Sequence, residues 1–331
     1  MRISLVIQQY MKHNRFDVGP YSISTDVISL LFVAFLLILT IGFAEKVPNW
    51  ENLSLRLFAA GVLYLVVINQ SRRLKEGWLL VLVRSAAIIG LFASLFDAVD
   101  SLQHIIVDGW MDDALLAAEH AITGTESAAF LQQFINPALT EGMMFTYVIY
   151  TLLLPLVAFI CYWSQGMRGA NDYLLNLAIG FVVCFIGFIL FPVASPLYHA
   201  PQLYSVPLDG GLFTWCGEWI RQNQHYAGGS LPSPHCTAAT IMLVMMYRHN
   251  KECFFVALPT ILMLFVSTVY GRYHYVWDGI VGILCALCVV KYSPKIVNAV
   301  NAAQSWINRT AKSRVVPEST QIDVLNERTK S

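Results

Sequence analysis

The sequence predicts an all-α fold, a polytopic membrane bundle of about eight transmembrane helices. Hydrophobic residues make up 56% of the 331 residues and charged residues only 13%, against roughly 25% charged residues in a soluble domain. The charged residues are clustered, which leaves apolar runs long enough to cross a bilayer as helices. Basic clusters recur after every second run, as expected of a chain that crosses a membrane repeatedly.

Eight apolar runs account for these helices in chain order. The sixth run is short, but Pro234 and His235 precede it and can lie at the membrane interface. Two runs fall in an N-terminal region, residues 1–77, and six in a core, residues 78–292, which a polar tail follows at residues 293–331. The runs cover residues 27–43, 53–69, 78–98, 143–163, 174–192, 236–248, 253–270 and 276–292.

Lysine and arginine predict the orientation of these runs, because basic loops stay in the cytoplasm. No lysine or arginine occurs between residues 85 and 167. Eight alternating spans place every basic cluster on one side, so we expect an integral, multi-pass protein with both termini in the cytoplasm. The net charge of zero and the lack of a basic patch give no sign of a nucleic-acid partner. The basic clusters are Lys12 and Arg15, Arg72 to Lys75, Arg168, Arg248 to Lys251, and Lys291 to Lys295.

Two polar features interrupt the apolar pattern. The segment 97–141 carries eight acidic residues between apolar positions at helical spacing, which predicts one or two amphipathic helices along the outer membrane surface. We expect its polar face to be exposed to solvent, with a lid or a docking surface as the alternative. Arg84 lies about two turns into the third run, where an arginine must snorkel or pair; we expect it to snorkel to the cytoplasmic face.

The first histidine motif is P-S-P-H at residues 232–235, just before the sixth run. Prolines on both sides of a serine fix an extended turn and cannot continue a helix backward, so we expect a helix to begin near His235. Its unpaired N–H groups would form a seat for phosphate. Ser233 would cap the helix or donate its hydroxyl to a phosphate oxygen. A proline-rich loop with an incidental histidine is the alternative.

The second motif places His274 and Asp278 at the start of the eighth run, four residues apart and hence on one helix face. Asp278 can accept a hydrogen bond from one imidazole nitrogen and leave the other nitrogen as a nucleophile. Because an unpaired aspartate there is costly, a paired role is favoured; a structural pair at the interface is the alternative. Arg272 would bind phosphoryl oxygens or lipid headgroups.

A third segment, F-P-V-A-S-P at residues 191–196, ends the fifth run. Eight alternating spans bring this segment and both histidine motifs to the side opposite the basic clusters, the periplasmic or lumenal face. Two histidines and one aspartate on one face can move a phosphoryl group through a phosphohistidine. One histidine attacks, the aspartate orients it, and the other histidine protonates the leaving group.

These segments together resemble the type-2 phosphatidic acid phosphatase superfamily of integral membrane enzymes, and more narrowly its inositol phosphorylceramide synthase branch, the aureobasidin-resistance type. The signature P-S-x-H is met at residues 232–235, and the branch's S-T-x-Y-x-x-x-H-Y-x-x-D is met in full at residues 267–278. Residues 191–196 are similar to the first conserved block. The resemblance covers about residues 143–292, or 78–292 if the third run supplies the first helix of a six-helix phosphatase-like core.

The resemblance implies a role for each histidine: His274 is the nucleophile and His235 the acid, with Asp278 beside them. It implies no metal and no other cofactor. The usual phosphatase pattern has an arginine where Thr268 stands, and basic residues around the first block, whereas none occurs between residues 169 and 220. This departure favours the synthase branch.

Phosphate would then be bound by Arg272, Arg221, Ser233 and helix-start amides. We therefore expect a lipid phosphotransferase that moves a headgroup phosphate from a phospholipid to a lipid hydroxyl, such as that of ceramide. A lipid phosphate phosphatase that hydrolyses phosphatidic acid-like or isoprenoid phosphates is the alternative. Membrane lipids are the expected partners, and the sequence predicts no oligomeric state. A transporter with vestigial motifs would show inverted repeats with broken helices, and the sequence has none.

Overall fold

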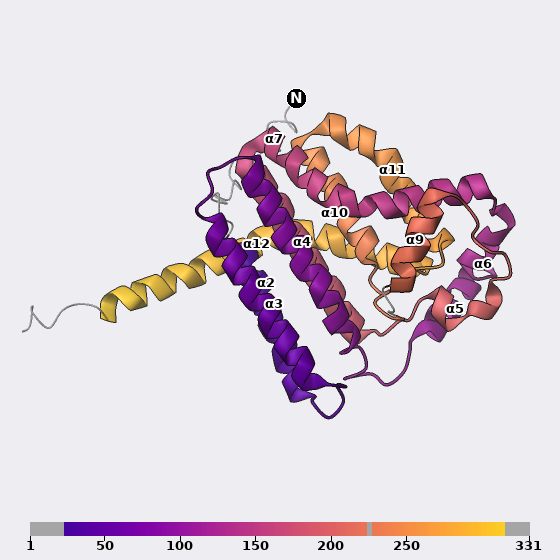
Figure 1. Ribbon diagram of the computed structural model, residues 1–331, viewed down its shortest axis with the longest axis horizontal. Coiled ribbons are helices and arrows are strands. Elements are labelled where there is room, and N and C mark those ends of the chain that lie inside the picture. Colours follow the sequence, from indigo (N-terminus) through magenta and orange to yellow (C-terminus); the bar gives the residue numbers. More distant parts are fainter. Residues whose placement is uncertain (1–22, 224–226, 315–331) are drawn as a thin grey trace, which may run out of the picture. The chain divides into compact units, whose positions relative to one another are not determined.

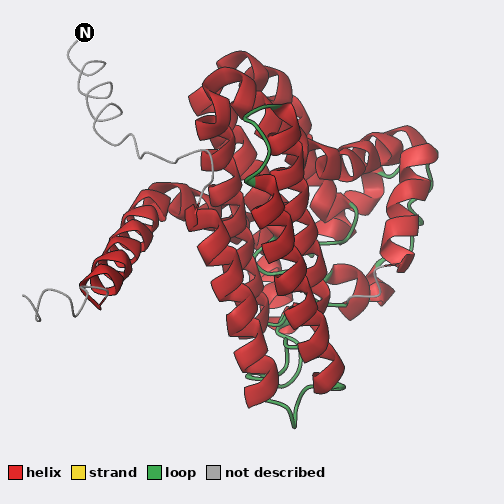
Figure 2. Cartoon of the chain, turned by 60° about the vertical axis from the view of Figure 1, so that its left-hand side comes forward, coloured by secondary structure: helices red, strands yellow, loops and turns green. Residues whose placement is uncertain are grey.

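The computed structural model describes residues 23–223 and 227–314, and all regular structure within them is helical (Figures 1 and 2). The chain divides into two compact units, and the larger one, residues 17–291, contains the fold and the site described below. The predicted fold class, an all-α membrane bundle, is confirmed. The predicted basic positions Lys12 and Arg15 lie outside the described residues.

The N-terminal helices are α2 (Ile23–Gly42), α3 (Trp50–Ser71) and α4 (Trp78–Asp100), which correspond to the first three predicted runs. Each packs against the next, and α4 also packs against α7. Large apolar side chains on their outer sides are exposed, as with Leu31 and Phe58. A lipid environment would cover such faces, because hydrocarbon tails replace the missing protein contacts.

The prediction that Arg84 snorkels is wrong. Its guanidinium is 2% exposed and bonds both oxygens of Asp26, at 2.7 and 3.3 Å. Tyr64 donates a third hydrogen bond to Asp26, at 2.9 Å. Arg84, Asp26 and Tyr64 lie on α4, α2 and α3, and we call them the membrane ion pair. The expectation treated Arg84 as an isolated charge in the membrane, whereas an aspartate on a neighbouring helix neutralises it.

The core is built on α7 (Pro137–Leu190), whose 54 residues contain the fourth and fifth predicted runs. Its two arms meet at Gly166, which has φ 65° and ψ −159°, a conformation that glycine adopts without a steric penalty. Helix α10 (Pro234–His249) packs against α7 and against α11 (Lys251–Tyr270). Most side chains of α10 are buried, since other helices surround it.

Six of the described helices are long and apolar enough to cross a membrane. They are fewer than the eight predicted runs for two reasons: α7 holds two runs, and α10, the short sixth run, has only 16 residues. The last of the six, α12 (Val276–Arg314), continues beyond residue 292, where the predicted run ended. Residues 315–331 of the predicted tail lie outside the described residues.

Short helices connect the long ones. Between α4 and α7 lie α5 (Asp112–Thr123), α6 (Ser127–Leu131) and η1 (Gln132–Phe134), and between α7 and α10 lie α8 (Pro196–His199), η2 (Pro201–Leu203) and α9 (Leu212–Asn223).

The acidic segment is thus helical in part, as predicted. Its polar face is not simply exposed, because Asp112, Glu119 and Glu126 are 0–4% exposed. Each of these carboxylates accepts backbone N–H groups, which is why it can be buried.

Candidate active site

Helix α10 begins at Pro234, one residue from the predicted start, and Ser233 is its N-cap. The Ser233 hydroxyl accepts a hydrogen bond from the backbone N–H of Cys236 at 3.3 Å, which is the first of the two roles expected of it. Its own N–H donates to the backbone oxygen of Asp278 at 2.9 Å. This bond ties the first histidine motif to the second. Ser233 is fully buried and does not line the cavity described below.

Asp278 lies in the first turn of α12, and His274 lies in the turn before that helix. The Asp278 carboxylate is fully buried and accepts the N–H of Tyr275 at 2.9 Å. Its Oδ2 is 3.4 Å from Nδ1 of His274. The predicted pair is therefore brought together, although by a capping turn and not by two positions on one helix face.

Ser230 is a member of the site that the sequence analysis missed. Its hydroxyl lies 2.6 Å from Oδ2 of Asp278 and 3.0 Å from Nδ1 of His274. The shorter contact from the imidazole thus goes to the serine, not to the carboxylate. Ser230 connects His274 to Asp278, and its position two residues before Pro232, in a Gly-Gly-Ser turn, was the available signal.

The two histidines face each other across one hydrogen bond: Nδ1 of His235 is 3.2 Å from Nε2 of His274. Tyr147 stacks on the His235 ring, with centroids 4.9 Å apart. With the proton of His274 on Nδ1, where it faces the oxygens of Ser230 and Asp278, Nε2 of that ring carries a lone pair and accepts a hydrogen bond from Nδ1–H of His235. We call Ser230, His235, His274 and Asp278 the histidine site.

Both imidazoles line a cavity of about 110 Å³. Its wall includes Ala194 and Ser195 of the third predicted segment, so all three segments meet here. Among its described lining residues, Arg221 on α9 supplies positive charge. Arg221 pairs with Glu218, and its hydrogen bond holds the pKa of that carboxyl below its usual value. The site can therefore offer a nucleophile, a proton donor and a guanidinium to one phosphate.

Arg272, a predicted phosphate ligand, is not brought into that cavity. Its guanidinium donates to the backbone oxygen of Val206 and lies 4.7 Å over the ring of Tyr204. It lines a neighbouring cavity of about 510 Å³, which shares Arg221 and Tyr273 with the histidine cavity. Burial raises the pKa of Tyr273 to about 12, so its phenol stays protonated between the two cavities.

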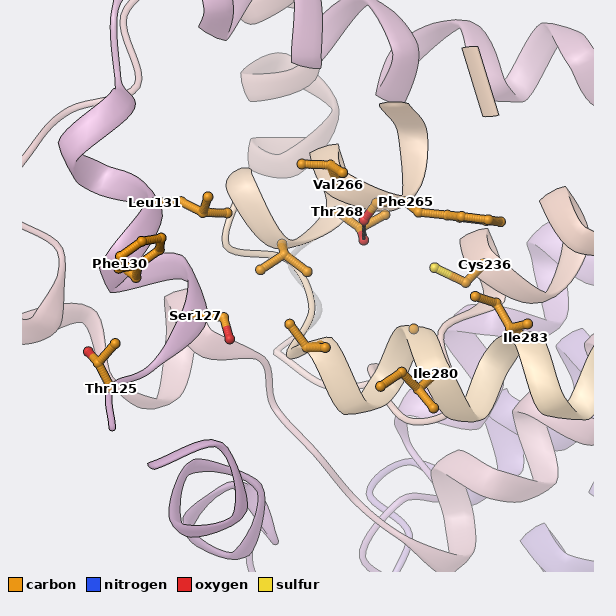
Figure 3. A pocket seen from close by; sticks show the side chains of 13 residues that line it. Thr125, Ser127, Phe130, Leu131, Cys236, Phe265, Val266, Thr268, Ile280 and Ile283 are labelled. Carbon is orange, nitrogen blue, oxygen red and sulfur yellow. Dashed lines mark hydrogen bonds between the residues drawn. The ribbon is translucent and has the colours of Figure 1, made fainter. Parts of the chain in front are cut away.

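A third cavity, of about 580 Å³, is apolar and lies between α6, α11 and α12 (Figure 3). Phe130 and Leu131 on α6 face Val266 on α11 and Ile280 on α12 across it. It shares no described lining residue with the histidine cavity. This apolar cavity is therefore separate from the histidine cavity, whose lining includes both imidazoles and Arg221.

Comparison with known proteins gives one family match. A family model described as the PAP2 superfamily matches residues 113–292. The matched range contains all three motif segments and begins inside the acidic segment, between residues 78 and 143, the two starts that the sequence analysis left open. No curated protein and no solved structure matches the chain. Among the described residues, no group of three or more His, Cys, Asp or Glu side chains is arranged to hold a metal ion.

Proposed function

Because the chain belongs to the PAP2 superfamily of phosphatases and phosphotransferases, we propose that it is a membrane-embedded lipid phosphotransferase that works through a phosphohistidine. The observation that carries this proposal is the 3.2 Å contact between His235 and His274 beside a cavity that Arg221 lines. A nucleophile and a proton donor so close together can act on the two ends of one P–O bond.

The reaction has two steps. In the first, the lone pair on Nε2 of His274 attacks phosphorus, the P–O bond to the departing alcohol breaks, and His235 gives its proton to that oxygen. In the second, His235 takes a proton from the acceptor hydroxyl, whose oxygen attacks phosphorus while the P–N bond breaks. Arg221 stabilises the charge on the phosphoryl oxygens in both steps.

Asp278 orients the imidazole of His274, the proposed nucleophile. Its carboxylate faces the N–H on Nδ1 of His274 directly, at 3.4 Å, and through the hydroxyl of Ser230, which accepts a hydrogen bond from that N–H and donates to the carboxylate. This fixes the tautomer with a free lone pair on Nε2 and stabilises the positive charge that the ring gains on attack. The logic is that of a serine–histidine–aspartate triad with the histidine as attacker.

The inositol phosphorylceramide synthase-like reaction is the specific form that we propose. A phospholipid donates its headgroup phosphate, and a lipid hydroxyl such as that of ceramide accepts it. Two features of the sequence support this choice: the full branch motif at residues 267–278, and the lack of basic residues between 169 and 220. The cavity that contains Arg272 and opens beside the histidine cavity offers room for the group attached to the phosphate.

Hydrolysis is the second candidate, since the histidine cavity of about 110 Å³ is small and water could take the place of the acceptor. The two reactions share their first step. Purified protein should be incubated with labelled phospholipid, with and without ceramide, while new lipid and water-soluble phosphate, free or still bearing the headgroup, are both measured. A new phosphorylated lipid that forms only with ceramide is expected. Water-soluble phosphate without new lipid would assign the protein as a phosphatase, and the formation of neither product would refute the proposal.

The proposal places the histidine site on the periplasmic or lumenal face, with both termini in the cytoplasm, because of the charge asymmetry in the sequence. Asp209 and Lys251 are exposed positions expected on opposite sides. Single cysteines placed there in a cysteine-free background should react differently with a membrane-impermeant thiol reagent. Asp209→Cys should react in intact cells, or in sealed vesicles whose outer surface is the periplasmic or lumenal face, and Lys251→Cys only after permeabilisation. The reverse pattern would contradict the orientation.

A further inference from the structure

Helix α5 sends two carboxylates into the protein and not into solvent. Asp112 is fully buried and accepts three hydrogen bonds: from the N–H of Ala194 at 2.8 Å, the N–H of Ser195 at 3.1 Å and the hydroxyl of Tyr275 at 3.0 Å. A buried carboxylate is tolerated only where donors replace the water it has lost. These donors come from two segments that border the histidine site.

The first segment is held in a strained conformation. Ser195 has φ 128° and ψ 156°, a region that residues other than glycine rarely occupy. Such a conformation persists when the surroundings over-determine it, and Asp112 does so by accepting two consecutive N–H groups. Because Ala194 and Ser195 form part of the wall of the histidine cavity, Asp112 sets the position of that wall.

The second segment is the start of α12. Glu119 lies about two turns after Asp112 on α5. It is 2% exposed and accepts a hydrogen bond from the N–H of Val276 at 2.7 Å. Val276 is the first residue of α12, two before Asp278. Tyr275, bonded to Asp112, directly follows His274. The same helix thus holds both the cavity wall and the turn that carries the nucleophile and its aspartate.

We propose that Asp112 and Glu119, which we call the acidic clasp, are positioning residues of the histidine site. They hold the 194–195 wall and the start of α12 in register, so that Nε2 of His274 faces the phosphate. They touch neither the reacting atoms nor, in this structure, the cavity itself. This inference rests on the proposed function and adds to it a role for the outer acidic helix.

Asp113 provides a matched control. It is the next residue on α5, but its side chain is 89% exposed and bonds His199. Asp112→Asn should lower kcat about 30- to 100-fold, because a misplacement of about 1 Å can cost about 100-fold. The NH₂ group of asparagine would face one of the three donors. KM should change less than about threefold, and Asp113→Asn should stay within about twofold of the unchanged protein in both constants.

A double-mutant cycle separates positioning from stability. Glycine adopts the backbone conformation of Ser195 without strain, so the wall should depend less on Asp112 in a Ser195→Gly background. We expect Asp112→Asn to cost about one tenth as much there as in the unchanged protein. Activity is expressed per folded molecule, measured from the monodisperse fraction after purification. Equal losses in the two backgrounds, or unchanged activity of folded Asp112→Asn protein, would overturn the inference.

Two milder variants keep the test decisive if Asp112→Asn fails to fold. Tyr275→Phe removes one of the three donors and should lower kcat about three- to tenfold. Glu119→Gln should lower kcat by a similar factor by loosening the start of α12. Normal kcat in both variants would also overturn the inference. Failure of the proposed function would look different, since His274→Ala would then retain activity whatever the clasp variants do.

Discussion

Two groups of buried polar side chains in this protein have similar ingredients and different surroundings. The membrane ion pair joins Arg84, Asp26 and Tyr64 across helices α4, α2 and α3. The histidine site joins His274, Ser230, Asp278 and His235. In both groups, an aspartate with at most 5% exposure accepts hydrogen bonds from a hydroxyl and faces a nitrogen base.

The difference lies in access to a cavity. Both oxygens of Asp26 are bonded, and Asp26, Tyr64 and Arg84 line none of the five best-formed cavities among the described residues. In the histidine site, by contrast, two imidazoles line a cavity. Each group keeps one buried polar atom with no hydrogen-bond partner among the described residues, Nε of Arg84 and Oδ1 of Asp278, so it is the cavity that separates the two groups. A charged group inside a membrane protein is thus structural when its partners close on it. It is a candidate for chemistry when they open onto a cavity.

The largest expected effect comes from the proposed nucleophile. His274→Ala should lower turnover of labelled phospholipid by about 10⁵-fold or more, because no other group can form the covalent intermediate. His235→Ala should also abolish turnover, since the leaving group then lacks its proton. His249→Gln is the matched control: this histidine bonds Asp172, away from the site, and its loss should leave turnover within about threefold. Near-normal turnover in His274→Ala would end the phosphohistidine mechanism.

The next effect tests the aspartate of the histidine site. Asp278→Asn should retain a small residual activity, about 10³- to 10⁴-fold below the unchanged protein, because the asparagine side chain no longer fixes the tautomer of His274. A rapid-quench experiment measures the formation of the labelled phosphoenzyme, and this step should slow by the same factor. Slow breakdown with normal formation would instead place Asp278 in the second step.

Substitutions in the membrane ion pair should lower the stability of the protein and leave its turnover nearly unchanged. Arg84→Met leaves the Asp26 carboxylate buried and unpaired, and breaking a buried pair costs about 3–5 kcal/mol. Thermal unfolding in detergent should show this loss, and the double variant Arg84→Met with Asp26→Leu should recover most of it. Turnover per folded molecule should stay within about threefold. A loss beyond about tenfold in folded protein would show that this pair serves the reaction.

The sequence predicted the features that are local in the chain, but not the contacts between residues far apart in it. Hydropathy located the runs, and the charge pattern put His235 and His274 on one side, because both signals are local in the chain. The pairing of Arg84 with Asp26 and the burial of Asp112 depend on contacts between residues 58 and 82–83 positions apart. Such contacts follow from helix packing, which no single segment reveals. Ser230 lay beside a recognised motif, yet its role depends on Asp278, 48 residues away.

Ser230 should give a smaller effect than the aspartate it contacts. Ser230→Ala removes the acceptor 3.0 Å from Nδ1 of His274 and leaves the carboxylate at 3.4 Å to replace it. We expect kcat to fall about 10- to 100-fold, equivalent to about 1.4–2.7 kcal/mol, with KM nearly unchanged. Ser94→Ala serves as the control, because the hydroxyl of Ser94 donates to the backbone oxygen of Leu91 within helix α4, away from the histidine site. Unchanged kcat in Ser230→Ala would show that Asp278 orients His274 alone.

The smallest expected effect is that of a chelator, which should leave turnover unchanged. In the proposed steps, Arg221 stabilises the negative charge on the phosphoryl oxygens and His235 protonates the leaving oxygen, so no Lewis acid is needed. Two carboxylates of the acidic segment that could attract a divalent ion are already engaged: Asp112 accepts three hydrogen bonds, and Asp113 bonds His199. Turnover should be measured before and after EDTA treatment and after the addition of Mg²⁺, Mn²⁺ or Zn²⁺. Activity lost in EDTA and restored by one of these ions would contradict the mechanism, because the histidine site would then depend on a metal ion as well as on its own side chains.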